Sequence, residues 1–240
     1  MDSTPEQLRF ASIPGCIIRA DFAGGGLSSD LGPLLLKGVD RQIGLTERVC
    51  AAIDDTRHPG YITHTLHDIL KQRIYQIASG YEDGNDCNSL RHDPVFRLGV
   101  GGKPFDTDDT EGALASGSTI SRFEHAVSSK DIYRLSEALV DQFIASYATP
   151  PQALVLDIDH SEDAAYGQQP LAFYNHHYQS TCYLPLMVFE GLSGALVAAV
   201  LRPGKRPTGA ENAMILKWVL KRVRERFPHT QIPKFGLELP

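Results

Sequence analysis

The sequence predicts an α+β protein in which a mostly helical first part precedes a strand-rich second part. Before residue 150, apolar residues recur at helical spacing in several segments. After it, short apolar runs rich in β-branched residues dominate, which is typical of buried strands. Pro150 and Pro151 end the last helical pattern. We therefore predict a helical region over residues 1–150 and a second region over residues 151–240.

The first part begins with a predicted short strand over residues 16–22, followed by a helix over residues 31–44. Ser28 or Ser29 can cap this helix, and its first turn tolerates Pro33. Residues 63–83 have the apolar stripe of an amphipathic helix. The stripe comprises Leu66, Ile69, Leu70, Ile74 and Ile77.

Three further segments complete the first part. A short helix is expected after the polar stretch 82–94, and residues 98–118, rich in Gly and Asp, indicate an exposed loop. A helix over residues 116–127 can be capped by Ser118 or Thr119. The last helix, over residues 129–148, carries a predicted apolar stripe at Ile132, Leu135, Leu139 and Phe143.

The second part is predicted as successive strands followed by one long helix over residues 210–227. The strand candidates are residues 153–159, 171–179, 180–191 and 194–204. The helix has an apolar face formed by Met214, Ile215, Trp218, Val219 and Val223. Its basic side, formed by Lys217, Lys221, Arg222, Arg224 and Arg226, could follow a DNA backbone or remain solvated while the apolar face packs on the sheet.

Asp157 and Asp159 are the candidate catalytic carboxylates, because an apolar strand delivers both near its end. Alternation along a strand places them on the same face. Carboxylates grouped in this way suit a hard divalent cation such as Mg²⁺. The alternative is a capped strand end with exposed acids in the turn that follows. His176 and His177 are adjacent and would point to opposite faces of a strand, so they are poorly placed to share one ion.

Two enzyme classes compete for this aspartate strand. The pattern Asp157-x-Asp159-x-Ser161 resembles the nucleophile motif of haloacid-dehalogenase-type phosphatases, which expect a parallel sheet with a helix soon after the motif. This chain instead offers further strands, which suit antiparallel pairing. The second class is that of enzymes with a ribonuclease-H-like fold, which opens with a strand that carries an aspartate, two more strands and then a helix. The order of elements in this chain favours this second class.

Composition is that of a soluble globular protein, with 42% hydrophobic and 22% charged residues. No stretch approaches the roughly 20 apolar residues that span a bilayer, and the first residues lack a secretory pattern. We therefore expect a cytoplasmic protein with no membrane partner. The formal net charge of −6 counts mildly against a nucleic-acid binder, although a local basic face is sufficient to engage phosphates.

The chain resembles transposases of bacterial insertion sequences, particularly the 1380 family of the DDE group. The matching stretches follow one another in family order over about Asp21 to Ile232. They are DFAGGGLSSDLGPLLLKGVDRQIGLTERV, LKQRIYQIASGYEDGNDCNSLRHDPVF, STISRFEHAVS, LVLDIDHSEDAAYGQQ, YLPLMVFEG, LRPGK and RVRERFPHTQI.

The resemblance implies DNA transposition, in which three carboxylates on a ribonuclease-H-like sheet hold Mg²⁺, with Mn²⁺ as the alternative ion. The family's first aspartate maps onto Asp159, with Asp157 as the fallback. The implied partner is double-stranded DNA at the element's terminal inverted repeats, and a homo-oligomer is possible. Arg122, with Ser121 and Thr119, would recognise those repeats if residues 116–127 form a recognition helix, the alternative being a surface helix of a small bundle.

The resemblance also places a second catalytic aspartate on the strand after the long helix. There the chain reads PKFGLELP, with Glu238 as its only acid. We therefore expect a truncated copy with an incomplete catalytic triad, an incomplete ribonuclease-H-like domain of three strands and one helix, and little strand-transfer activity. A protein of this kind could instead act as a non-catalytic DNA-binding fragment that occupies the terminal repeats.

Overall fold

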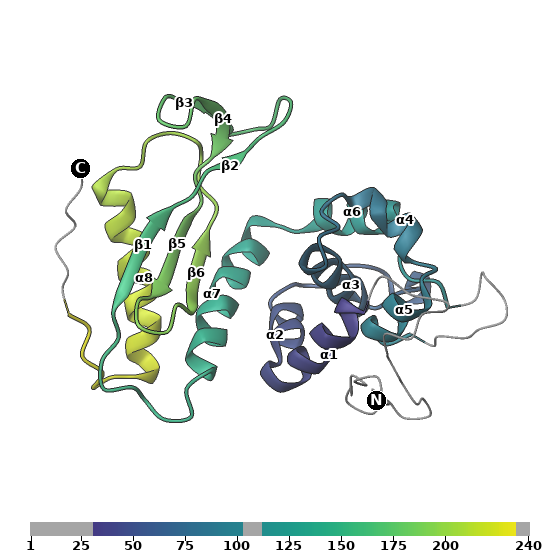
Figure 1. Ribbon diagram of the computed structural model, residues 1–240, viewed down its shortest axis with the longest axis horizontal. Helices are drawn as coiled ribbons and strands as arrows, with labels where there is room; N and C mark the ends of the chain where they lie inside the picture. The colour runs from purple at the N-terminus through teal and green to yellow at the C-terminus, as the bar shows by residue number, and fades with distance from the viewer. Residues whose placement is uncertain (1–30, 103–111, 234–240) are drawn as a thin grey trace, which may run out of the picture. The chain divides into compact units, whose positions relative to one another are not determined.

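The computed structural model describes residues 31–102 and 112–233, and the chain divides into two compact units between Ser129 and Lys130 (Figure 1). The first unit is helical among its described residues, and the second combines two small antiparallel sheets with two long helices. The predicted α+β class is therefore confirmed. The predicted strand over residues 16–22 and the caps Ser28 and Ser29 lie outside the described residues.

The division of the chain differs from the boundary that we predicted near residue 150. The strands do begin only at Leu156, but helix α7 (Ser129–Ala145) is grouped with the second unit. The reason is packing, because Val140, Phe143 and Ile144 of α7 are buried in the same core as the strands.

The helices of the first unit form two small apolar clusters. One cluster is built on Tyr75 and Phe96, and the other on Ile69 and Ile120. The α-helices are α1 (Gly32–Ile43), α2 (Leu45–Ala51), α3 (Leu66–Ala78), α4 (Cys87–Leu90), α5 (Pro94–Val100) and α6 (Gly117–Ala126), with 3-10 turns at Pro59–Tyr61 and Gly84–Asp86.

Helix α3 is rotated relative to the stripe that its apolar residues predict. Ile69 and Leu70 are buried as expected, but Ile77 is 49% exposed. Two glutamines take the interior positions. Gln72 exchanges hydrogen bonds with the backbone of Ala115, through Nε2 at 2.8 Å and Oε1 at 2.9 Å. Gln76 donates to the carbonyl of Asp83 at 2.6 Å. Because their hydrogen bonds are satisfied, these polar side chains are buried where the sequence predicted apolar ones.

Two further sequence predictions need correction in the first unit. Leu98 and Val100 are buried in α5, so helix occupies the start of the segment that we predicted as an exposed loop. Helix α6 has Ser116 as its N-cap, without a side-chain cap hydrogen bond, so the predicted caps Ser118 and Thr119 lie inside the helix.

The main sheet of the second unit is an antiparallel meander in the order β1-β5-β6. Its strands are β1 (Leu156–His160), β5 (Leu186–Glu190) and β6 (Leu196–Val200). A second sheet, in the order β2-β4-β3, is inserted between β1 and β5 in the chain. Its strands are β2 (Asp163–Ala164), β3 (Phe173–Asn175) and β4 (Ser180–Tyr183).

The single strand that we predicted over residues 180–191 is divided between the two sheets. Proline has no backbone N–H to donate, and Pro185 marks the point where the chain leaves β4 and enters β5. Next to it, the N–H of Leu184 donates to the carbonyl of Arg202 at 3.0 Å.

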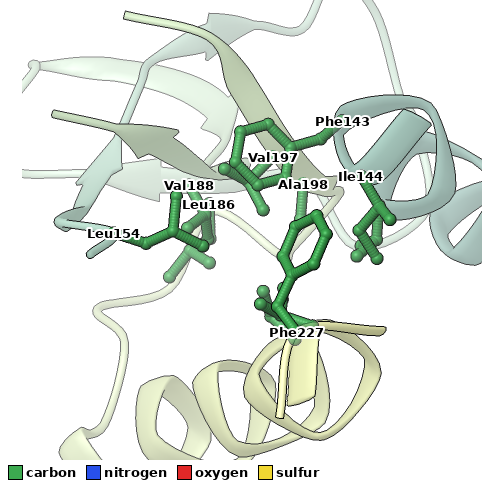
Figure 2. Packing of buried hydrophobic residues seen from close by; sticks show 11 residues of the cluster. Phe143, Ile144, Leu154, Leu186, Val188, Val197, Ala198 and Phe227 are labelled. Carbon is green, nitrogen blue, oxygen red and sulfur yellow. The ribbon is translucent and has the colours of Figure 1, made fainter. Parts of the chain in front are cut away.

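The core of the second unit lies between the main sheet and two helices, α7 and α8 (Gly209–Arg226), and Figure 2 shows its side chains meeting. Arg222 of α8 links the helices, since its guanidinium donates to Asp141 of α7 at 2.7 Å and to Glu137 at 3.1 Å. The buried members are Val140, Phe143, Ile144, Leu154, Leu186, Val188, Val197, Ala198, Val219, Val223 and Phe227.

Helix α8 begins with a capping box, in which Thr208 and Glu211 exchange hydrogen bonds. Its predicted apolar face is only partly buried. Val219 and Val223 are fully buried, whereas Met214 is 66% exposed. On α7, the predicted Ile132 is also exposed. Both exceptions lie in the first turns of their helices, and the buried core residues lie further along each one.

Candidate functional site

The two candidate carboxylates lie side by side on one face of β1. Burial alternates along the strand, so that Asp157 and Asp159 are exposed while Leu156 and Ile158 pack against the core. The predicted placement on a common face is therefore what the structure has. Their antiparallel partners on β5 are Phe189 for Asp157 and Met187 for Asp159.

Each carboxylate has a local feature that positions it. Oδ1 of Asp159 accepts a hydrogen bond from the backbone N–H of His160 at 2.8 Å. Asp157 depends on the glycine that follows β5. A Cβ atom at Gly191 would come within 2.5 Å of Oδ2 of Asp157. Gly191 therefore leaves the space that this carboxylate occupies.

This pair of carboxylates fits a divalent cation as part of a site. Hard divalent cations such as Mg²⁺ take oxygen ligands, and both carboxylate side chains are exposed on the same face of β1. Residues two apart on a strand are about 6.6 Å apart, so one ion cannot sit close to both without side-chain movement. Among residues 31–102 and 112–233, no three His, Cys, Asp or Glu side chains are grouped as metal ligands. A complete site therefore needs ligands beyond these two.

The outer edge of the main sheet shows where the chain returns after α8. Gln231 forms a parallel bridge with Ala153, just before β1. The N–H of Leu154 donates to the carbonyl of Gln231 at 2.9 Å, and the N–H of Gln231 donates to Gln152 at 2.8 Å. This bridge follows the long helix, where the resemblance places the next strand of the sheet. Glu238, the acid that follows it in the sequence, lies outside the described residues.

Glu190, at the end of β5, is a buried acid that the sequence analysis did not single out. One carboxylate oxygen accepts from the N–H and the Oγ–H of Ser193, both at 2.7 Å. The other accepts from the N–H of Val155 at 3.3 Å. Burial alone would raise the pKa of Glu190, but these hydrogen bonds outweigh it and leave the pKa lowered. Glu190 faces the core, away from Asp157, so it is a structural anchor for the β5–β6 turn.

On the opposite side of β1 from the aspartates, His160 lies near buried polar groups. Burial lowers the pKa of His160, and the positive charge of Arg202 lowers it further. Arg202 is itself buried and forms an ion pair with Glu211 at 2.9 Å. The side chain of Asn212 acts in the opposite direction and raises the pKa of His160. No sequence pattern distinguishes His160 from the other histidines, because only the fold places it beside Arg202.

The three predicted DNA-binding residues all lie on α6. Thr119 and Arg122 line one hollow of about 500 Å³ in the first unit, whereas Ser121 is exposed on α6 and does not line it. The guanidinium of Arg122 folds back along the helix and donates to the carbonyl of Ser118 at 3.2 Å.

The lining of this first-unit hollow carries both signs of charge. Arg57 is paired there with Asp55 at 2.6 Å, and Asp54 contributes a second carboxylate. Such a surface is less suited to a phosphate backbone than a purely basic one would be.

The family of the chain follows from a comparison with protein-family models. The model described as Transposase DDE domain group 1 matches residues 10–236, which is nearly the whole chain. The chain belongs to this DDE transposase family. No curated protein and no solved structure matches this transposase.

Membership of the family makes transposition the activity class, DNA the substrate, and a divalent metal ion the general requirement. It gives no support to the phosphatase alternative, which also expected a parallel sheet where this transposase pairs β1 and β5 antiparallel. No helix in the described part of the chain has both the length and the apolar character needed to cross a bilayer.

Proposed function

We propose that this DDE transposase carries out Mg²⁺-dependent phosphoryl transfer on DNA, with Asp159 as the first metal-binding carboxylate and Asp157 as its neighbour. The observation that carries the proposal is the shared exposed face of β1, on which both acids stand in a chain of this family. Mn²⁺ is the alternative ion, because it accepts the same oxygen ligands.

The proposed fold of the second unit is the first part of a ribonuclease-H-like domain. Three features support it. The aspartate strand opens an antiparallel meander of three strands, a long helix follows the third strand, and the chain then returns parallel to β1 at Gln231. The last feature supports a next strand beside β1, which is where the resemblance places the family's second catalytic aspartate.

In this proposal the residues of the chain bind and orient the metal ion, and the metal ion would act as the Lewis acid. A divalent ion held there would supply Lewis acidity, which would favour deprotonation of a water or a 3′-hydroxyl and would stabilise negative charge on the leaving oxygen. Asp159 would hold its oxygens on the exposed face of the sheet, with one of them fixed by the N–H of His160. Asp157 would offer its carboxylate from the space that Gly191 leaves open.

We further propose that helix α6 contacts the terminal inverted repeats of an element of the 1380 family, through Thr119, Ser121 and Arg122. The exposure of Ser121 and Arg122 on a ten-residue helix supports this role. A homo-oligomer is part of the proposal as well, because the two ends of an element must be brought together.

The decisive experiment is a DNA-nicking assay with the full chain, a DNA duplex that carries the element's ends, and Mg²⁺ or Mn²⁺. Cleavage that disappears in Asp159→Asn and persists in Asp163→Asn would support the assignment, since Asp163 is an exposed acid on β2, which follows β1 in the chain but belongs to the other sheet. Cleavage that survives in both Asp159→Asn and Asp157→Asn would refute it.

A second candidate function is DNA binding without cleavage. It is favoured by one observation, that no third metal-ligating side chain joins the aspartates within the described ranges. A mobility shift with end-containing DNA, together with no nicking in either metal, would select this candidate. In that case Arg122→Ala should reduce the shift while Asp159→Asn leaves it unchanged.

A further inference from the structure

The second unit contains a hollow of about 660 Å³ between the β3–β4 hairpin and the segment that follows β6. Its lining includes Tyr174, His176, His177, Lys205 and Arg206. No carboxylate belongs to the lining described here. The volume lies within the range of small-ligand sites and is far too small for a DNA duplex to enter.

We propose that this hollow holds an unpaired nucleotide of the DNA strand, with its phosphate at Lys205 and Arg206 and its base against Tyr174. The inference rests on the proposed function, in that DNA is the substrate, and adds the form in which the DNA is bound. His160 lines the hollow and directly follows Asp159 in β1, although its side chain lies on the opposite face of that strand from the two aspartates.

The charge of the hollow selects an anion. Lys205 and Arg206 are exposed, and neither forms an ion pair with a carboxylate among the described residues. Nζ of Lys205 lies 4.3 Å from the centre of the Phe173 ring, which holds the ammonium over β3. Two cations that have no carboxylate partner in the described ranges attract a phosphodiester backbone.

The aromatic groups select an unpaired base in addition to a phosphate. Tyr174 is 56% exposed, and its ring meets the ring of His176 edge-on, with centres 5.1 Å apart. His177 and Tyr178 form a second edge-on pair at 4.7 Å. An exposed ring that neighbouring rings hold in place offers a stacking surface to a base. Stacking requires a base face that is free, and paired bases inside a duplex have none to offer.

The two walls of the hollow are tied together before any ligand binds. Nδ2 of Asn175 donates to the carbonyl of Gly204 at 3.1 Å, across the hollow from hairpin to loop. Oδ1 of Asn175 accepts from the N–H of His177 at 2.9 Å, which fixes the turn after β3. Gly204 is required for this contact, because a Cβ there would lie 2.0 Å from the carbonyl oxygen of Cys182. A site organised in advance loses less entropy on binding.

The test is fluorescence anisotropy of a labelled hexathymidine with the full chain in EDTA, so that the result does not depend on the metal site. Tyr174→Ala should weaken binding by about 5- to 150-fold, the loss expected for one stacked base. Tyr174→Phe keeps the ring and should retain the affinity. Tyr166→Ala is the matched control, because Tyr166 is 86% exposed outside the hollow, and it should bind as the parent does.

The phosphate contact has its own readout. In Lys205→Gln, the slope of log affinity against log salt concentration should become less negative by about 0.7, as expected for one lost phosphate contact. Lys130→Gln, an exposed lysine of α7, should leave the slope unchanged. A variant that is merely destabilised would show a lower melting temperature at every salt concentration. Destabilisation alone would not make the salt slope of Lys205→Gln differ from that of Lys130→Gln.

Three results would overturn the proposal. These are equal affinities for Tyr174→Ala and Tyr166→Ala, thymidine monophosphate binding as tightly as the hexamer, and a fully paired duplex binding tighter through the same residues. The test is separate from that of the metal site. Oligonucleotide binding that persists in Asp159→Asn, while nicking is lost, would leave both proposals standing. Absence of nicking in the parent protein would affect only the metal assignment.

Discussion

Replacing Glu190 by glutamine tests how the second unit holds the end of β5. The side chain is only 2% exposed and accepts three hydrogen bonds, two from Ser193 and one from Val155. An amide can accept at only one of its two ends. If its oxygen meets Ser193, its NH₂ group faces the N–H of Val155 and leaves two buried donors without acceptors.

The expected cost of Glu190→Gln follows from these contacts. Hydrogen bonds to a charged group contribute about 1.5–3 kcal/mol each, and a buried unsatisfied donor costs about 1–3 kcal/mol. Neutralising a buried charge recovers part of that loss because the desolvation penalty disappears. We therefore expect a fall of about 2–4 kcal/mol in the free energy of unfolding at pH 7.

The lowered pKa of Glu190 also determines how the stability difference between parent and variant changes with pH. The pKa of Glu190 is lowered in the folded protein, so its contribution to stability is present above the unfolded pKa of about 4.3. It is lost as the pH falls through the lower folded value. Urea unfolding of parent and variant at pH 7 and at pH 3 should therefore show the difference narrowing in acid.

The control is Glu225→Gln, because Glu225 is an exposed acid of α8. It should change the free energy of unfolding by less than about 0.5 kcal/mol. A difference below about 0.5 kcal/mol for Glu190→Gln at pH 7, or one that does not narrow on acidification, would refute the reasoning.

Three further predictions concern the core, the candidate metal site and the first unit. Val223→Ala should lower the free energy of unfolding by about 2 kcal/mol in urea titrations, since Val223 is fully buried, whereas Met214→Ala on the same helix should have almost no effect. Gly191→Ala should weaken Mn²⁺ binding about 10-fold in calorimetric titrations by displacing Asp157, whereas Gly209→Ala, with nothing near its added Cβ, should leave binding unchanged. Gln72→Leu should destabilise the first unit by about 2–4 kcal/mol, because two buried backbone groups lose their partner; thermal unfolding that matches the parent would contradict this.

Local patterns identified most of the elements. The period of apolar residues located α3, α7 and α8, and β-branched runs located β1, β5 and β6. Alternation along a strand placed Asp157 and Asp159 on one face, which is how they stand. These results depend on near neighbours in the chain, which is why one sequence was enough.

Patterns of apolar residues were less successful at telling which ones become buried. Ile77, Ile132 and Met214 fit the predicted stripes but remain exposed. An apolar stripe shows which face of a helix packs against the rest of the protein. It does not show how much of the length of the helix the packing partner covers. Conversely, Gln72 and Glu190 are buried because backbone groups distant in sequence satisfy them, and a single sequence does not reveal those partners.

The sequence by itself determined the α+β class, the aspartate strand and the resemblance to DDE transposases, because each is written in local order and spacing. Only the tertiary structure decided that α7 packs with the sheet, that Gly191 gives Asp157 its space, and that Tyr174 and Lys205 line one hollow. These facts join residues far apart in the chain. Their positions follow from packing and hydrogen bonding across the fold, which local patterns do not specify.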